Sequence, residues 1–425
     1  MISQASVLYE NKWKYTFYPF WISQAFSLLG SSIVQFTLVW WLTRSTGQAS
    51  VLATATSFAV LPEIIINPFA GAIVDRANRK RVMIAADALI ACATLVLALL
   101  FYRGLVQVWH IYMIMFIRSA GSAFHYPAEQ ATISTIVPKE QLIKIAGLNQ
   151  TLQGIVRIIA APLGALILEL IDIQGSLFVD ILTAILAITI LSFVKIPNPG
   201  QNQDRKFGFV KTVLIDSLDG LTYLFKWKGI LAVVLLAMFI KVALAPAISF
   251  LPLIVSQHFS LGSAQYSFVE IAVGAGLIAG GIILSTWGGF KKQIYTSLAG
   301  IVGIGLTFLL AGFLKSTQFN LFTLLMFIAG FMVTVIDGPF ISIVQACVDD
   351  AYQGRVITIM GSLLWLTTPF GLAIAGPFSD RFGVLSWYKI AGFFCIIGAL
   401  VSAFVPALKN VESMKNIESG KKAGT

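Results

Sequence analysis

The chain has 425 residues, of which 57% are hydrophobic and only 11% are charged. Soluble domains carry about 25% charged residues because their surfaces must be hydrated, so this composition excludes an ordinary water-soluble protein. The formal net charge is +10, but the basic residues are dispersed among short loops, which argues against a nucleic-acid-binding protein.

Twelve apolar segments are long enough to cross a bilayer as α-helices, which takes about 20 residues. We predict helices at 17–42, 51–74, 82–101, 109–129, 145–170 and 173–194, and then at 229–255, 266–287, 293–314, 319–343, 355–378 and 387–406. The short alternating segments of a β-barrel are not seen. The predicted fold class is an all-α membrane protein with twelve transmembrane helices in two pseudo-symmetric six-helix bundles.

The domain boundaries follow from the polar segments. We expect a first bundle at 1–194, a cytoplasmic linker at 195–228, a second bundle at 229–406 and a cytoplasmic tail at 407–425. The first apolar segment is too long for the core of a signal peptide, so it is expected to remain as the first helix.

The distribution of basic residues predicts the orientation. With the N-terminus in the cytoplasm, 21 of the 29 Lys and Arg residues fall in cytoplasmic segments. Because cytoplasmic loops of membrane proteins are enriched in Lys and Arg, we expect a multi-pass protein of the cell membrane with both termini in the cytoplasm.

A weak internal repeat supports two related halves. In the fifth and eleventh predicted helices the same residue types recur at a constant offset of 207: Gly154, Pro162 and Gly164 match Gly361, Pro369 and Gly371. Repeats of this kind build many secondary transporters, whose binding sites lie between the halves near the bilayer midplane.

The loop after the second helix reads Gly71-Ala-Ile-Val-Asp75-Arg76-Ala-Asn-Arg79-Lys80-Arg81. It resembles the signature loop of the major facilitator superfamily, G-x-x-x-D-R-x-x-R-K/R. The fourth helix carries a run from Arg118 to Pro127 that is similar to the helix-4 arginine motif of that superfamily. Within the superfamily, the runs Met83–Asp87 and Phe124–Ala128 most resemble bacterial macrolide-efflux-type exporters.

The resemblance implies a conformational gate. In related transporters the loop aspartate engages the N-terminal end of helix 11, whose partial positive charge attracts a carboxylate. The gate residues implied here are Gly71, Asp75, Arg76, Arg79, Lys80 and Arg355. Alternatively, the cations of the loop only enforce topology. The loop of the second half, Gly288–Lys292, keeps basic residues but lacks the Asp-Arg pair.

Several ionisable residues fall within predicted helices. A charge at the bilayer centre costs about 2.5–3.5 kcal/mol, so each such residue is expected to face a cavity or a partner. The candidates for proton coupling are Glu63, Asp337, Asp180 and His125. Glu63 lies between Pro62 and Asn67-Pro68, so we expect a broken helix beside it. The alternatives are a fixed salt bridge of Glu63 with Arg118 or Arg157, a structural Asp180, and a packing or gate role for His125.

Other polar residues are candidates for the wall of a substrate cavity. The fifth helix presents a polar stripe that must face a cavity or neighbouring helices, because lipid cannot hydrate it. The candidates are Gln24, Gln35, Arg118, Gln150, Arg157, Lys241 and Trp365. Cations in this set favour neutral or anionic cargo.

The sequence contains no nucleotide-binding loop, no zinc-ligand spacing and no nucleophile motif, so we expect no enzyme, no metal and no cofactor. We predict a monomeric exporter of a bulky amphipathic compound, macrolide-like as the resemblance implies, with protons, a small-molecule substrate and the lipid bilayer as its partners and no nucleic acid. The alternatives are an exporter of a siderophore or acidic metabolite, a lysophospholipid transporter, and a non-transporting membrane receptor or scaffold.

Overall fold

The computed structural model describes residues 12–196, 222, 224–225, 227–348 and 350–412. These residues are almost entirely helical, and no strand occurs among them. Eleven of the described helices are long and apolar enough to span a membrane. Helix α5 (Val108–Ile136) is not one of the eleven, although it is as long as its neighbours. Its sequence includes Arg118, His125 and Glu129, which lower its hydropathy. The eleven candidate spans confirm the prediction of a helical membrane protein.

The chain divides into two compact units, which are described separately. Unit 1 comprises Met1–Leu42 and Phe58–Val210, and unit 2 comprises Thr43–Ser57 and Lys211–Thr425. The division falls inside two helices. The last residues of α2 (Lys12–Thr46) and the first residues of α3 (Ala49–Arg76) are grouped with unit 2, and the rest of both helices with unit 1. The linker predicted at 195–228 and the tail predicted at 407–425 lie largely outside the described residues.

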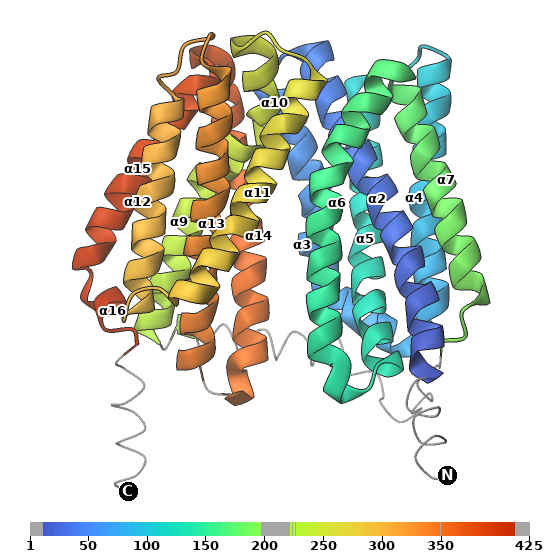
Figure 1. Ribbon diagram of the computed structural model, residues 1–425, viewed down its shortest axis with the longest axis horizontal. Coiled ribbons are helices and arrows are strands. Elements are labelled where there is room, and N and C mark those ends of the chain that lie inside the picture. Colours follow the sequence, from blue (N-terminus) through green and yellow to red (C-terminus); the bar gives the residue numbers. More distant parts are fainter. Residues whose placement is uncertain (1–11, 197–221, 223, 226, 349, 413–425) are drawn as a thin grey trace, which may run out of the picture. The chain divides into compact units, whose positions relative to one another are not determined.

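Unit 1 is built from long helices that lie side by side (Figure 1). Besides α3 and α5 it contains α2 (Lys12–Thr46), α4 (Arg79–Tyr102), α6 (Leu142–Leu170) and α7 (Ile173–Phe193), with a 3₁₀ turn at Lys139–Gln141 before α6. Helix α4 packs against both α5 and α7. This arrangement brings buried polar residues of α4, α5 and α7, among them Thr94, Arg118 and Asp180, next to one another.

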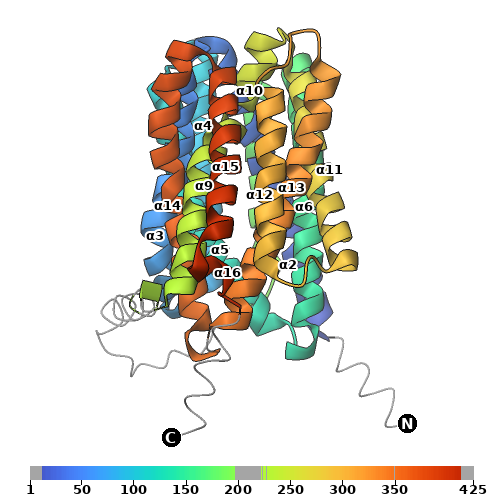
Figure 2. The ribbon, with the colours of Figure 1, turned by 90° about the vertical axis from the view of Figure 1, so that its left-hand side faces the viewer.

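Unit 2 contains the remaining helices. They are α9 (Lys228–Ser249), α10 (Leu251–Leu253), a π-helical turn (Ile254–His258), α11 (Ser263–Trp287), α12 (Gln293–Ala311), α13 (Phe319–Cys347), α14 (Asp350–Phe382), α15 (Val384–Phe404) and α16 (Pro406–Lys409). Helix α15 packs beside α9 and α12 (Figure 2), and α13 packs against α11 and α12.

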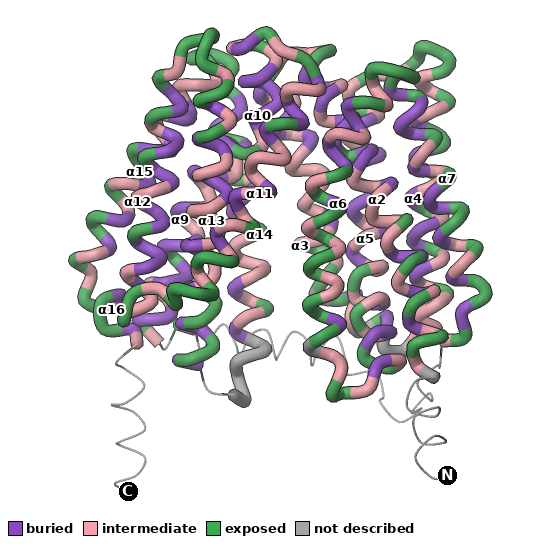
Figure 3. The backbone as a smooth tube through the Cα atoms, viewed as in Figure 1, coloured by how far each residue is buried: buried purple, intermediate pink, exposed green. Residues whose placement is uncertain are grey.

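Exposed residues on the helices are often large and apolar (Figure 3). On α7, for example, Phe178, Leu182 and Ile185 are 66%, 48% and 54% exposed. Soluble proteins rarely expose contiguous apolar surface, so these faces are suited to contact with lipid. Most buried residues are apolar as well, and a smaller set of buried polar side chains, such as Asp87, Arg118 and Asp180, lies among them.

One glycine pair of the internal repeat, Gly164 and Gly371, lies at a close helix contact in each unit. In unit 1, a Cβ added to Gly164 of α6 would meet the ring of Phe36 on α2. In unit 2, a Cβ added to Gly371 of α14 would meet the backbone of Val242 on α9. Each glycine thus allows the fifth helix of its half to lie close to the first, and the prediction of two pseudo-symmetric halves is confirmed.

One local prediction was wrong. We expected the second helix to be broken between Pro62 and Asn67-Pro68, but α3 is helical throughout Ala49–Arg76. Proline within a transmembrane helix is tolerated where neighbouring groups satisfy the freed carbonyl. Glu63 is therefore carried on a continuous helix.

Candidate functional site

A buried ion pair lies at the junction of α4, α5 and α7. The Arg118 guanidinium donates from Nη1 to Asp180 Oδ2 at 2.5 Å, and Nη2 lies 3.5 Å from Asp180 Oδ1. Thr94 donates from Oγ1 to the same Asp180 oxygen at 2.7 Å. Arg118 is 8% exposed and Asp180 is 2% exposed. Two residues predicted for different roles, one at a cavity and one in proton coupling, are brought together here, and Arg118 pairs with Asp180, not with Glu63.

A second polar pair lies in the same unit, between α2, α4 and α5. Ser27 donates from Oγ to Asp87 Oδ1 at 3.0 Å. The Nε2 atom of His125 lies 3.4 Å from the same Asp87 oxygen. Asp87 is 2% exposed, so this carboxyl group is held within the protein and not at a surface. His125 was predicted as a proton-coupling candidate without a partner, and Asp87 is that partner in the structure.

Two cations of the signature motif, Arg79 and Lys80, begin α4 and bind the C-terminal ends of other helices of unit 1. Arg79 donates from Nη1 to the Ala131 carbonyl at 2.7 Å and to Thr135 Oγ1 at 2.5 Å, near the end of α5. Lys80 donates from Nζ to the carbonyls of Ser192 and Val194 at 2.6 and 2.8 Å, at the end of α7. Cations at helix C-termini satisfy the last carbonyls and oppose the helix dipole.

Replacing Lys80 is expected to destabilise unit 1. Lys80→Met removes two charge-assisted hydrogen bonds at a partly exposed site, which is expected to cost about 1 kcal/mol. The change is measurable as a lower midpoint of thermal unfolding for the purified protein in detergent. Arg81→Met is the matched control, because Arg81 is exposed and donates to Asn78 Oδ1 from its backbone N–H, which the substitution keeps. Equal midpoints for the two variants would contradict the capping role.

Of the remaining gate residues, Gly71 is described by the structure. A Cβ added to Gly71 would meet nothing within 4 Å. The side chains of Asp75, Arg76 and Arg355 lie outside the described residues. The predicted contact between Asp75 and helix 11 therefore stays a prediction.

The other two acidic candidates for proton coupling are half-buried. Glu63 lies on α3, and no ion pair of Glu63 occurs among the residues that the structure describes. Asp337 lies on α13 in unit 2, where the charge of Lys241 on α9 acts on it. Lys241, predicted at a cavity wall, is thus an electrostatic partner of a predicted proton carrier.

The predicted cavity residues differ in exposure. Gln35, Gln150, Arg157 and Trp365 are exposed, and Trp365 reaches 57%. Gln24 is only 5% exposed, and its Nε2 donates to Ser23 Oγ at 3.1 Å inside unit 1. Their contact with substrate stays a prediction. Within the described residues no group of His, Cys, Asp and Glu could hold a metal ion.

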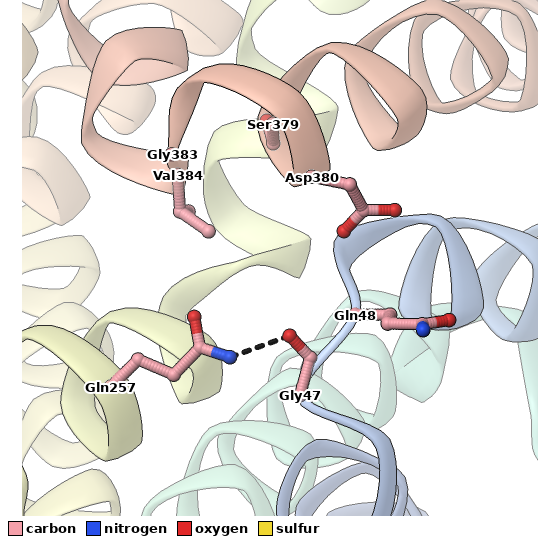
Figure 4. A pocket seen from close by; sticks show the side chains of 7 residues that line it. All are labelled: Gly47, Gln48, Gln257, Ser379, Asp380, Gly383 and Val384. Atoms are coloured by element: carbon pink, nitrogen blue, oxygen red, sulfur yellow. Dashed lines mark hydrogen bonds between the residues drawn. The ribbon is translucent and has the colours of Figure 1, made fainter.

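A polar site that was not predicted from the sequence lies in unit 2, at the end of α14. Asp380 accepts hydrogen bonds from the backbone N–H groups of Ala49 and Ser50 at 2.5 and 3.1 Å, and so caps the N-terminus of α3. Gln257 of the π-helical turn donates from Nε2 to the Gly47 carbonyl at 2.5 Å, just before α3 (Figure 4). Gly47, Gln257 and Asp380 line a pocket of about 380 Å³. Gln48, Ser379, Gly383 and Val384 complete its lining.

A sequence signal for this site was present. The run Ala375-Gly376-Pro-Phe-Ser-Asp380-Arg381 repeats the pattern of Ala70-Gly71-Ala-Ile-Val-Asp75-Arg76. Residues four apart share a helix face, and Gly376 does approach the same turn of α3 as Asp380. A Cβ added to Gly376 would lie 2.9 Å from the Ser50 Cα and 3.1 Å from the Ala53 Cβ.

Comparison with known proteins agrees with this architecture. Residues 20–372 match the family described as Major Facilitator Superfamily. Macrolide efflux protein A of Streptococcus pyogenes is 32% identical over 402 residues, which cover 95% of this chain and 98% of that protein. Macrolide efflux protein A of Enterococcus faecalis is 32% identical over 326 residues, which cover 77% of this chain and 100% of that protein.

Solved structures show the same fold at low sequence identity. The crystal structure of the nucleoside transporter NupG gives a TM-score of 0.69 at 16% identity, and covers 89% of this chain and 98% of its own. A D-xylose-proton symporter gives a TM-score of 0.68 at 16% identity, and covers 91% and 98%.

Proposed function

Because this chain belongs to the major facilitator superfamily, we propose that it exports a bulky, macrolide-like compound across the cell membrane by proton antiport with alternating access. The similarity to macrolide efflux proteins along nearly the whole chain carries this proposal. The membrane-spanning helices and the family support transport as the general function, and the orientation with both termini in the cytoplasm follows from the basic loops.

The described ionisable residues are distributed in a way that suits proton coupling. Glu63 in unit 1 and Asp337 in unit 2 are half-buried acids within membrane helices. Intramembrane acids are costly and commonly mark proton pathways. Asp180 is less suited to cycling, because its carboxylate is held by Arg118, which keeps its charge at all accessible pH values. We assign Asp180 a structural role.

The pairing of cations bears on the cargo. Arg118 is neutralised by Asp180, and Lys241 lies in the field of Asp337. Arg157 is exposed on α6 and is the cation of this set best placed to meet solvent or substrate. A neutral or weakly basic amphipathic cargo fits this balance better than a strongly anionic siderophore.

Gates on both sides would accompany alternating access. Asp75 and Arg76 with the start of α14 near Arg355 form the proposed cytoplasmic gate, and Arg79 and Lys80 hold the start of α4 to the ends of α5 and α7. The end of α14 carries the same sequence pattern, with Asp380 on the start of α3. We assign this second copy to the outer gate.

Transport by the purified, full-length protein in proteoliposomes tests the proposal. Radiolabelled erythromycin is expected to move when a pH gradient is imposed and to stop when an ionophore collapses the gradient. Glu63→Gln and Asp337→Asn are each expected to reduce gradient-driven movement by at least about tenfold. Glu140→Gln, the same chemical change on an exposed acid before α6, is the matched control.

The outcomes separate the parts of the proposal. If both acidic variants transport like the wild type, the assignment of Glu63 and Asp337 is wrong. If erythromycin moves equally with and without a gradient, antiport is wrong. If it never moves, the same vesicles are tested with a siderophore and with a lysophospholipid, and failure with all three would favour a receptor or scaffold.

A further inference from the structure

Helices α4 and α5 carry two polar pairs that are equally spaced along both helices. Thr94 lies seven residues after Asp87 on α4, and Arg118 lies seven residues before His125 on α5. Seven residues are close to two helical turns, so each helix presents its two polar residues on one face. One pair of positions holds the Arg118–Asp180 ion pair with Thr94. The other holds Asp87 with His125.

The two pairs differ in the kind of cation. Arginine stays protonated, so the pair of Arg118 with Asp180 is permanent. Histidine gains and loses a proton between about pH 5 and 8, so the same arrangement two turns away can change its charge. The structure thus contains a fixed ion pair and a titratable one on the same two helices.

The contacts of Asp87 and His125 are incomplete in a way that suits a proton site. Among the described residues, Asp87 Oδ2 and His125 Nε2 are both sealed from solvent without a hydrogen-bond partner. Nε2 lies 3.4 Å from Asp87 Oδ1, which already accepts from Ser27. A small shift brings Nε2 to hydrogen-bond distance of the carboxylate once the imidazole carries a proton there.

Glu129 offers a route for the proton to this pair. It lies four residues after His125 on α5, on the same face and toward the end of the helix. The charges of His125 and Asp87 both act on it. In the opposite direction, Ile90 packs on Gly121 between the two polar pairs, at 2.9 Å from the position of an added Cβ. An apolar contact thus separates the titratable pair from the permanent one.

We infer that Asp87 and His125 form a proton-binding site within unit 1, which Glu129 connects to the end of α5. This inference rests on the proposed proton antiport. In the loaded state, His125 is protonated on both ring nitrogens, and its Nε2–H donates a hydrogen bond to the Asp87 carboxylate. In the empty state, the proton has passed to Glu129 and from there to water, His125 is neutral, and Ser27 still donates to Asp87.

The charged groups that face His125 from the surrounding helices are few. In the part of the chain that the structure describes, Asp87 of α4 and Glu129 of α5 act electrostatically on it. Helix α2 contributes Ser27, which is uncharged, and Arg118 and Asp180 neutralise each other beyond Ile90. The charge state of His125 therefore depends chiefly on two carboxyl groups that substitution can remove one at a time.

Transport in proteoliposomes gives the first test. Erythromycin export driven by a pH gradient is compared with erythromycin counterflow, which needs no net proton movement. For His125→Gln, Asp87→Asn and Glu129→Gln, the ratio of gradient-driven export to counterflow is expected to fall at least about tenfold. His110→Gln, at the start of the same helix, is the matched control and keeps the wild-type ratio. Variants that lower both activities equally would show a purely structural role and overturn the inference.

A second measurement does not depend on the substrate. The chain has three histidines, so NMR spectra of full-length protein labelled with ¹³C-histidine contain few signals, and His125→Gln assigns one by its loss. The His125 signal is expected to titrate between about pH 5 and 8, with a midpoint that changes in Asp87→Asn and in Glu129→Gln. A His125 signal that stays constant over this range would exclude the site.

The two measurements distinguish the hypotheses. If erythromycin is not transported but His125 titrates in response to Asp87, the proposed cargo is wrong and the proton site stands. If erythromycin is exported by the gradient while His125 stays in one charge state, the proposed function stands and the proton site is wrong.

Discussion

Asp180→Asn is expected to lower the thermal stability of the protein more than any other single carboxyl-to-amide change in unit 1. The substitution leaves the Arg118 guanidinium buried without a carboxylate, and breaking a buried ion pair typically costs about 3–5 kcal/mol. For a unit of this size such a loss corresponds to a midpoint of thermal unfolding lower by roughly 10 °C. Arg118→Met is expected to have a similar effect, because it leaves Asp180 buried and charged.

A double-substitution cycle separates the ion pair from simple packing. The cycle consists of wild type, Arg118→Met, Asp180→Leu and the double variant. Since the double variant removes both charges, its destabilisation is expected to be smaller than the sum of the Arg118→Met and Asp180→Leu changes. Scanning fluorimetry of each purified variant in detergent gives the four midpoints. Thr189→Val is the control on α7, because Thr189 is exposed and donates only to a carbonyl of its own helix. Additive effects of the two substitutions would show that the charges do not depend on each other.

The helices could be predicted because each depends on the local hydrophobicity of its own segment, which a single sequence shows. A run of apolar residues of bilayer length must form a helix, since lipid offers no partner for backbone groups. The segment predicted at 173–194 is observed as α7, Ile173–Phe193. The predicted break beside Glu63 failed for the same reason, because the demand for internal hydrogen bonds outweighs the local effect of Pro62.

The pairing of polar side chains was beyond the reach of the sequence. Arg118 and Asp180 are 62 residues apart in the chain, and nothing in either local sequence shows which helices pack together. Each was therefore assigned to a different task. His125 was a candidate for proton coupling, whereas Asp87 was assigned no role. Only the contact of α4 with α5 and α7 brings these residues into two defined pairs.

The site at the end of α14 could have been found from the sequence. The internal repeat relates corresponding helices of the two halves, such as α6 and α14, through Gly164 and Gly371. The copy of the signature pattern instead relates the C-terminal end of α3 to the C-terminal end of α14. Gly376 and Asp380 therefore match the signature motif although they do not occupy its usual position.

Asp380→Asn is expected to release the first turn of α3 from α14. The change removes the negative charge that caps the N–H groups of Ala49 and Ser50, and the loss of such a cap costs about 1–2 kcal/mol. A cysteine placed at Ala53 reports the release, because Ala53 is 3% exposed and packs beside Gly376. A loss of about 1–2 kcal/mol increases the fraction of molecules in which the cysteine at position 53 is exposed by roughly 5- to 30-fold. The rate of maleimide labelling is expected to rise by the same factor.

The labelling is measured on purified protein in which Ala53→Cys is the single thiol, with Cys92, Cys347 and Cys395 replaced by serine or alanine. Arg381→Gln is the matched control, because Arg381 is the neighbouring charge of the same motif, is exposed and lies over the Phe382 ring.

Gly376→Leu is expected to increase labelling at least as much as Asp380→Asn, since its side chain would occupy the space of Ser50 and Ala53. If Asp380→Asn labels at the rate of Arg381→Gln, the carboxylate does not hold α3, and the outer gate assigned to the second copy of the motif has no basis. If Gly376→Leu alone labels faster, close packing and not the charged cap joins the two helices.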